Sequence, residues 1–223
     1  MHLFVVNPKA AKPWLQTRGF KQGAPIRSRV QREVAPVLKI KEYKKNFHHH
    51  EIPDAFARLV EFQNSQAAPF CRGFSLAIDD RKKLLPISEK REFLDALCPL
   101  GPANSAGALY ALWAREGEKQ LDHSPVLTFG DEGSVHVVAE DVPQLLRILT
   151  FDAEPMIDAD SVLFMKDDSE PQSPGAMAYA LWFEKHVHHK PAKDSAEVEL
   201  IVRSAQSLLE KPLQSWLKHF KAH

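Results

Sequence analysis

Residues Pro125–Ala139 read PVLTFGDEGSVHVVA, and EDVPQLLRILT follows them directly. Two short β-prone runs, 126–129 and 135–138, stand on either side of the turn formers GDEG at 130–133. This order predicts a β-hairpin whose turn carries two adjacent acidic residues.

A helix is expected immediately after the hairpin. Asp141 is a residue type that accepts hydrogen bonds from the free N–H groups of a helix start, and Pro143 fits the first turn. One face of this helix is apolar, made by Val142, Leu145, Leu146 and Leu149. A hairpin followed by an amphipathic helix is a scaffold that contains no reactive group.

Two more segments extend the predicted sheet. In residues 73–79, apolar residues alternate with small or polar ones, which is typical of a strand with one face in the core. Residues 107–113, GALYALW, are apolar on both alternating faces and predict a central strand covered on both sides. We therefore expect an α+β fold, with a mostly antiparallel sheet of about four to six strands, helices packed on it and an added C-terminal helical segment. The strands are expected at 73–79, 108–114, 126–129 and 134–139.

Helix signals surround these strands. Pro53 and Asp54 predict the start of a short amphipathic helix that ends near Asn64. Ser88 predicts the start of a helix through about Cys98, which Pro99, Gly101 and Pro102 are expected to end. Asp194 and Glu197 form a capping-box pattern ahead of a long apolar stripe that Pro212 is expected to break or restart. The string at 173–182 echoes 105–113, but its flanks differ, which favours coincidence over a repeat.

Composition limits the class of protein. The 223 residues include Cys71 and Cys98, too few for a disulfide framework, so both are interpreted as buried thiols in a reducing compartment. The sequence has no apolar run of about eighteen residues and no secretion signal, so we expect a cytoplasmic protein without a membrane partner.

The net charge of zero hides an uneven distribution. Residues 1–50 hold eleven Lys and Arg against Glu33 and Glu42, and the remaining residues carry the balancing acidic excess. One interpretation is a basic extension that wraps its own acidic body. The alternative is a nucleic-acid-binding arm within residues 9–45.

The histidines show no metal-site spacing. Three consecutive residues, His48–His50, cannot all face one ion from a helix or strand, and the spacing of His186, His188 and His189 does not place two rings on one helical face. The HExxH, GxSxG and phosphate-loop motifs are absent as well. We therefore predict no catalytic residues, no cofactor and no metal, and keep a metal-dependent hydrolase built on His and carboxylate clusters as an alternative.

Several of these short motifs occur together in a known order. GALYALW at 107–113, PV at 125–126, FGDEG at 129–133, VVA at 137–139 and the following leucine-rich helix resemble the SUKH superfamily, which includes the yeast cell-wall-synthesis regulator and many bacterial immunity proteins. The IPD start at 52–54 is also similar. The resemblance covers about residues 52–150 and implies an α+β binding domain without catalytic residues. The segments on either side depart from the family's core. We therefore expect a basic N-terminal extension at 1–51, a SUKH-like α+β core at 52–150, and an acidic connector with C-terminal helices packed on the core at 151–223.

The family resemblance implies a partner, commonly a polymorphic toxin and often a nuclease, that is neutralised by direct contact. The expected partner is therefore a basic protein, with nucleic acid as the less favoured choice, and the oligomeric state stays open. An acidic exterior would steer such a partner toward the protein. The candidate partner-binding residues are Asp131, Glu132, Asp158, Asp160, Asp167, Asp168 and Glu170. For the last five, a plain acidic linker is an equal alternative.

Overall fold

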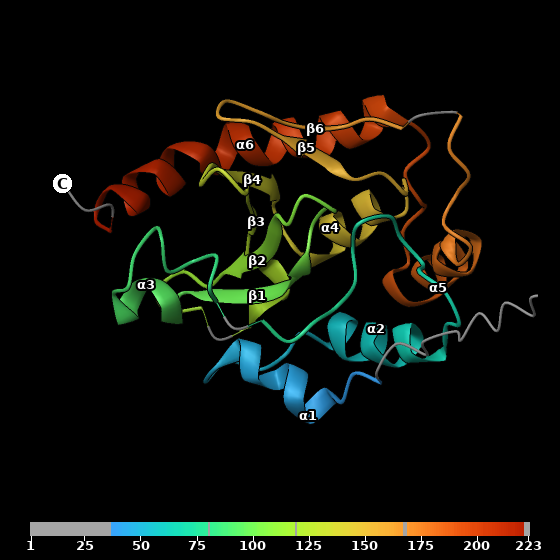
Figure 1. The fold of residues 1–223 in the computed structure, drawn as a ribbon, viewed down its shortest axis with the longest axis horizontal. Helices are drawn as coiled ribbons and strands as arrows, with labels where there is room; N and C mark the ends of the chain where they lie inside the picture. Colours follow the sequence, from blue (N-terminus) through green and yellow to red (C-terminus); the bar gives the residue numbers. More distant parts are fainter. Residues whose placement is uncertain (1–36, 80, 119, 167–168, 221–223) are drawn as a thin grey trace, which may run out of the picture. The chain divides into compact units, whose positions relative to one another are not determined.

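The centre of the computed structural model is an antiparallel sheet with the strand order β1-β2-β3-β4 (Figure 1). The structure describes residues 37–79, 81–118, 120–166 and 169–220. The strands of this sheet are β1 Leu97–Pro102, β2 Leu109–Trp113, β3 Val126–Phe129 and β4 Val135–Ala139. A second sheet pairs β5 Pro155–Ile157 with β6 Val162–Phe164. The helices are α1 Ile40–Tyr43, η1 Lys44–Phe47, α2 Asp54–Ser65, α3 Arg91–Asp95, η2 Leu121–His123, α4 Val142–Leu149, α5 Ala176–Val187 and α6 Ser195–Lys218. The predicted α+β class is confirmed.

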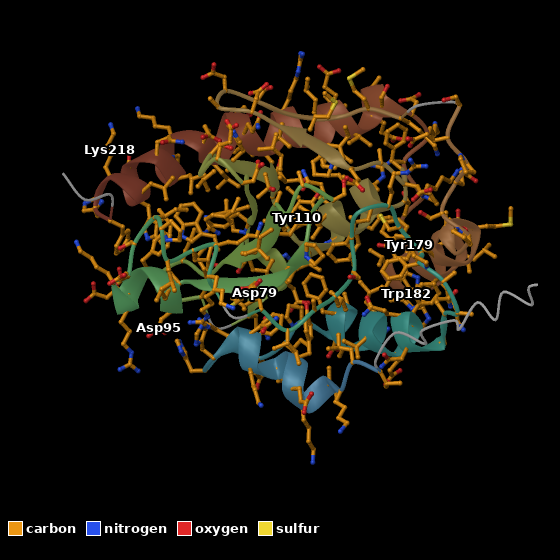
Figure 2. All side chains as sticks on the ribbon, in the orientation of Figure 1. Asp79, Asp95, Tyr110, Tyr179, Trp182 and Lys218 are labelled. Carbon is orange, nitrogen blue, oxygen red and sulfur yellow. The ribbon has the colours of Figure 1, made fainter. Side chains whose placement is uncertain are left out.

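Strand β2 separates two apolar clusters, as its sequence predicts. All five of its residues are buried. Tyr110 and Leu112 belong to a cluster built mainly with α2, α4 and α5, where Tyr179 and its neighbours pack (Figure 2). Leu109, Ala111 and Trp113 belong to the other cluster, which α3 and the end of α6 complete. Alternating side chains of one strand thus fill both sides of the sheet.

The hairpin and the helix after it form as predicted. The Gly130 N–H donates to the Ser134 carbonyl over 2.9 Å, and Gly133 takes the positive φ of 85° that the turn requires. An Asp141 carboxylate oxygen accepts from the Gln144 N–H at 2.8 Å and caps α4.

The first strand was not predicted. The expected helix from Ser88 to about Cys98 is reduced to α3, and residues 97–102 form β1 instead. Pro99 and Pro102 are tolerated because β1 is an edge strand, where a missing N–H breaks no essential ladder bond. The pairing with β2 shifts between Pro99 and Gly101, which is a β-bulge.

The strand predicted at 73–79 is wrong, although the segment does lie against the sheet. It is an irregular stretch whose Ala77 N–H donates to the Leu100 carbonyl of β1 over 3.2 Å. Gln63 of α2 takes the place of a neighbouring strand, accepting from the Leu76 N–H at 2.7 Å and donating to the Leu76 carbonyl at 2.9 Å. Side-chain hydrogen bonds therefore satisfy the backbone that a ladder would otherwise pair.

The long helix α6 lies beyond β4 at the other edge of the sheet (Figure 1). Val198, Ile201 and Val202 from its first half join the first apolar cluster, and Leu213 and Leu217 from its second half join the second. The predicted break at Pro212 is wrong, because the helix continues through it. The buried side chains of Leu213 and Leu217 just after the proline hold that turn against the sheet. Within the described residues, the helices are all too short or too polar to cross a bilayer.

Candidate functional site

An acidic cavity forms where two turns meet the second half of α6. Its volume is about 360 Å³. The β3–β4 turn and the start of β4 contribute residues 133–136, and the β5–β6 turn contributes Ala159 and Asp160. Helix α6 contributes Gln206, Glu210, Gln214 and Leu217. Three segments that are far apart in the sequence therefore line one cavity, which we call the acidic cavity.

Close packing holds the two turns together. His136 is buried at 6 % exposure, and its Nε2 donates to the Asp158 carbonyl oxygen over 2.9 Å. A Cβ at Gly130 would lie 2.5 Å from Ser134 Oγ and 3.1 Å from Ile157 Cγ2. The absence of a side chain at Gly130 thus allows the β5–β6 sheet to approach the hairpin.

Three of the predicted acidic residues have carboxylates free to bind a partner. Asp131 and Glu132 are exposed at the hairpin tip, and Asp160 is exposed on the wall of the acidic cavity. Within the part of the chain that the structure describes, these three carboxylates make no hydrogen bond or ion pair. They can therefore bind a cation without breaking an existing contact.

Asp158 has a different role, because its carboxylate shapes its own turn. It accepts from the Asp160 N–H at 2.9 Å, from the Ser161 N–H at 2.6 Å and from Ser161 Oγ at 3.0 Å. The backbone hydrogen bond from Asp160, followed by those from Ser161, lowers the pKa of Asp158. This residue positions Asp160 and is not itself free to contact a partner.

Glu210 belongs to the acidic cavity, although sequence reasoning missed it. Its Oε1 accepts from Gln214 Nε2 at 2.8 Å, while its Oε2 is buried without a partner among the described residues. A buried carboxylate oxygen without a donor is unfavourable, and an incoming ammonium or guanidinium group would satisfy it. Polar and apolar residues both surround Glu210 in the sequence of α6. Its sequence context therefore contains no signal that one of its carboxylate oxygens is buried.

Glu170 lies apart from the two turns that border this cavity. Glu170 forms an ion pair with Arg72 and lines a separate cavity of about 300 Å³. Asp167 and Asp168 lie outside the described residues. Of the seven predicted residues, Asp160 alone is seen to line the acidic cavity within the described part of the chain, while Asp131, Glu132 and Asp158 lie on the two turns that border it, and Glu210 is added to them.

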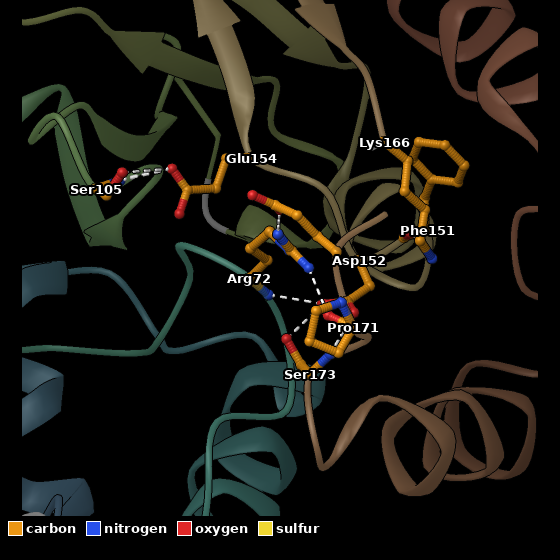
Figure 3. A network of polar contacts seen from close by, with 9 residues as sticks. Arg72, Ser105, Phe151, Asp152, Glu154, Lys166, Pro171 and Ser173 are labelled. Atoms are coloured by element: carbon orange, nitrogen blue, oxygen red, sulfur yellow. Dashed lines mark hydrogen bonds and ion pairs between the residues drawn. The ribbon is translucent and has the colours of Figure 1, made fainter. Parts of the chain in front are cut away.

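The segment that contains Glu170 is anchored to the core by Asp152. This carboxylate is 1 % exposed and accepts from the Arg72 N–H at 2.8 Å, from the Ser173 N–H at 2.7 Å and from Ser173 Oγ at 2.7 Å (Figure 3). Arg72 Nη2 in turn donates to the Pro171 carbonyl over 2.6 Å. The network joins both ends of the acidic segment, at Asp152 and Ser173, to the loop after α2. A plain linker would lack such hydrogen bonds to the core.

The two cysteines have no accessible thiolate. Both are free and buried, as predicted. Burial raises the pKa of Cys98 to about 12 and also raises the pKa of Cys71. Both thiols are protonated at neutral pH and serve as small core residues.

The histidine and basic-arm hypotheses gain no site from the structure. Among residues 37–79, 81–118, 120–166 and 169–220, no group of three or more His, Cys, Asp or Glu is arranged to hold a metal ion. The nucleic-acid hypothesis rests on residues 9–45, and most of that segment lies outside the described residues.

Comparisons of this chain with protein-family models, with curated proteins and with solved structures found no match.

Proposed function

We propose that this chain is a non-enzymatic protein-binding domain whose acidic cavity binds a lysine- or arginine-rich surface of another protein. The observation that carries the proposal is the buried, unpartnered Oε2 of Glu210 in a cavity whose rim already holds Asp160. Asp131 and Glu132 project from the neighbouring turn and extend the negative surface. A cationic side chain entering the cavity would supply the missing donor and would be drawn in by the surrounding carboxylates.

We propose further that the partner is a toxin and that the chain acts as an immunity protein. The support is the SUKH-like order of motifs at 52–150, which includes the hairpin that carries Asp131 and Glu132. Blocking a cationic surface is an effective way to neutralise a toxin that binds nucleic acid, since such a toxin relies on Lys and Arg to contact phosphates.

A pull-down from the native host, with the partner identified, purified and titrated against the full chain, tests this proposal. We expect a basic protein whose expression harms cells and whose effect is relieved by this chain. The double substitution Asp160→Asn with Glu210→Gln should weaken the measured affinity by about tenfold, because two charge-assisted contacts are lost.

The matched control is Glu61→Gln with Glu184→Gln. It removes the same charge from exposed positions on α2 and α5 and leaves the acidic cavity intact. We expect this control to bind like the unmodified chain. An acidic partner, or equal loss of affinity in the two double variants, would contradict the proposal.

A further inference from the structure

A third and larger cleft lies at the other end of the central strands. Its volume is about 1030 Å³, compared with about 360 Å³ for the acidic cavity. It is formed by the loop at 49–51, helix α3, residues 115–118 and 120 after β2, and the end of α6. Figure 2 shows Asp95 of α3 and Lys218 of α6 on this side of the molecule.

Aromatic rings form the floor of the cleft. The ring centroids of Trp113 and Trp216 are 5.2 Å apart, and those of Trp216 and Phe220 are 5.0 Å apart. Phe93 stacks behind Trp216 at 5.2 Å, which fixes the indole plane. Trp216 and Phe220 are only partly buried, so part of each ring faces the cleft.

The chain already places a cation on one of these rings. Lys90 Nζ lies 5.8 Å from the centroid of the Phe220 ring, within the range of a cation–π contact. The same ammonium donates to the His219 carbonyl at 3.1 Å. The end of α6 thus offers both a π face and backbone acceptors to positive groups.

The rim carries more carboxylates than it uses for its own contacts. Asp95 pairs with Arg91, and Glu118 pairs with Arg115. Glu51, Glu92 and Glu116 are exposed and have no hydrogen-bond or ion-pair partner among the described residues. His50 on the same rim has its pKa lowered by burial and then by His49, so it does not offset this charge at neutral pH.

We infer that this cleft binds an arginine side chain of a protein partner. A guanidinium group is planar, stacks on indole and phenyl faces, and directs its N–H donors sideways to carboxylates. The aromatic floor of the cleft can stack against the plane of such a group, and the free carboxylates around it can accept its N–H donors. A lysine ammonium is a more strongly hydrated point charge and would use the floor less well. The inference accepts the basic partner of the proposed function and adds a contact separate from the acidic cavity.

The direct test titrates the full chain with an acetylated, amidated five-residue peptide that contains two arginines between alanines. Nuclear magnetic resonance of the tryptophan indole N–H groups reports the site, after assignment by single Trp→Phe substitutions. We expect the signals of Trp113 and Trp216 to shift and that of Trp182 to stay in place. The matching lysine peptide should bind several-fold more weakly, and the citrulline peptide, which has the shape of arginine without its charge, should not bind.

Two variants then test the cleft residues. Glu92→Gln with Glu116→Gln should weaken binding of the arginine peptide by about fivefold. Trp216→Leu should weaken this binding by about fivefold or more. Glu61→Gln with Glu184→Gln, which removes the same charge from exposed positions on α2 and α5, is the control and should bind the peptide normally. The rim variant changes only exposed side chains, so it keeps the test valid even if Trp216→Leu does not fold.

Equal binding of the citrulline peptide, an unchanged affinity in the rim variant, or unchanged signals of Trp113 and Trp216 on addition of the arginine peptide would overturn the inference. So would indole shifts that follow protein concentration in the absence of peptide, because the occupant would then be a second copy of the chain. None of these outcomes bears on the acidic cavity, whose test uses the purified partner and different residues.

Discussion

Asp152 shows how a single residue can be acidic in composition yet structural in role. In the sequence it is one of several acids between 151 and 174, with nothing to separate it from Asp158 or Asp160. In the structure it is buried with three hydrogen bonds and a positive φ of 57°. Glu210 makes the complementary point, since a glutamate on a long helix is expected to be solvated. Both roles depend on tertiary neighbours that local patterns do not report.

The Asp152 network gives a prediction at this scale. Asp152→Asn should lower the free energy of unfolding by about 2 kcal/mol, because charge-assisted hydrogen bonds become neutral and the new amide N–H₂ faces the Ser173 N–H. Asparagine tolerates a positive φ, so the backbone conformation is kept. Urea unfolding measures the change. As a comparison, Asp160→Asn at an exposed site should alter the unfolding free energy by less than about 0.5 kcal/mol, and equal losses in the two variants would refute the role given to Asp152.

At the scale of elements, the middle of the sheet could be predicted and its edges could not. β2, β3 and β4 are dictated by alternating or continuous apolar residues and by the turn at 130–133. β1 contains LCPLGP, which has two prolines and a glycine, and these residues indicate a break unless the strand is known to lie at an edge. Edge position is a property of the assembled sheet, so the sequence pattern predicts only a helix that ends near Cys98 and is stopped by the residues after it.

Gly101 in β1 provides a test of that edge. Its φ is +151°, and an added Cβ would lie 2.0 Å from the Ser75 carbonyl oxygen. Gly101→Ala should therefore force the 73–79 segment away from β1 and lower the free energy of unfolding by about 3 kcal/mol. Gly117 is a matched control with a φ of +83° and open space around it, so Gly117→Ala should cost only about 1 kcal/mol through backbone strain. Thermal and urea unfolding of both variants measure the difference, and similar costs would show that the close contact at Gly101 is unimportant.

The start of α6 predicts a pH dependence. Glu197 accepts from the Lys193 N–H at 2.9 Å and forms an ion pair with Arg147 of α4. The backbone hydrogen bond from Lys193, aided by Arg147, lowers the pKa of Glu197. A lowered folded-state pKa means that the stabilisation is complete above the ordinary glutamate value and is lost as the pH falls through the folded value. Between about pH 5 and about pH 3, the unfolding free energy of the unmodified chain should therefore decrease more steeply than that of Glu197→Gln. Urea titrations at several pH values measure both slopes, and parallel curves would contradict this assignment.

At the scale of the whole molecule, the charge pattern connects the two proposed contacts. The acidic excess beyond residue 50 could be counted from the sequence, and so could the acids at the hairpin tip. The convergence of the two turns with α6 could not be predicted from the sequence. It depends on the packing of β5–β6 against the hairpin and on α6 covering the β4 edge. The cleft near Trp216 was likewise hidden, because its floor joins β2 to the last turns of the chain.

The final prediction follows from this charge pattern. If carboxylates at the acidic cavity steer a basic partner, the association rate constant should fall by at least about tenfold when salt rises from about 0.05 M to about 0.5 M. Asp131→Asn, Glu132→Gln and Asp160→Asn together should slow association at low salt and flatten this dependence. A triple variant at Glu61, Glu89 and Glu184, each changed to Gln, removes the same charge from exposed positions elsewhere. Stopped-flow mixing with the purified partner measures both rates. If the acidic cavity steers the partner, the triple variant at Asp131, Glu132 and Asp160 should reduce the association rate constant more than the triple variant at Glu61, Glu89 and Glu184. Equal reductions would mean that only the total charge matters and that the acidic cavity does not direct the encounter.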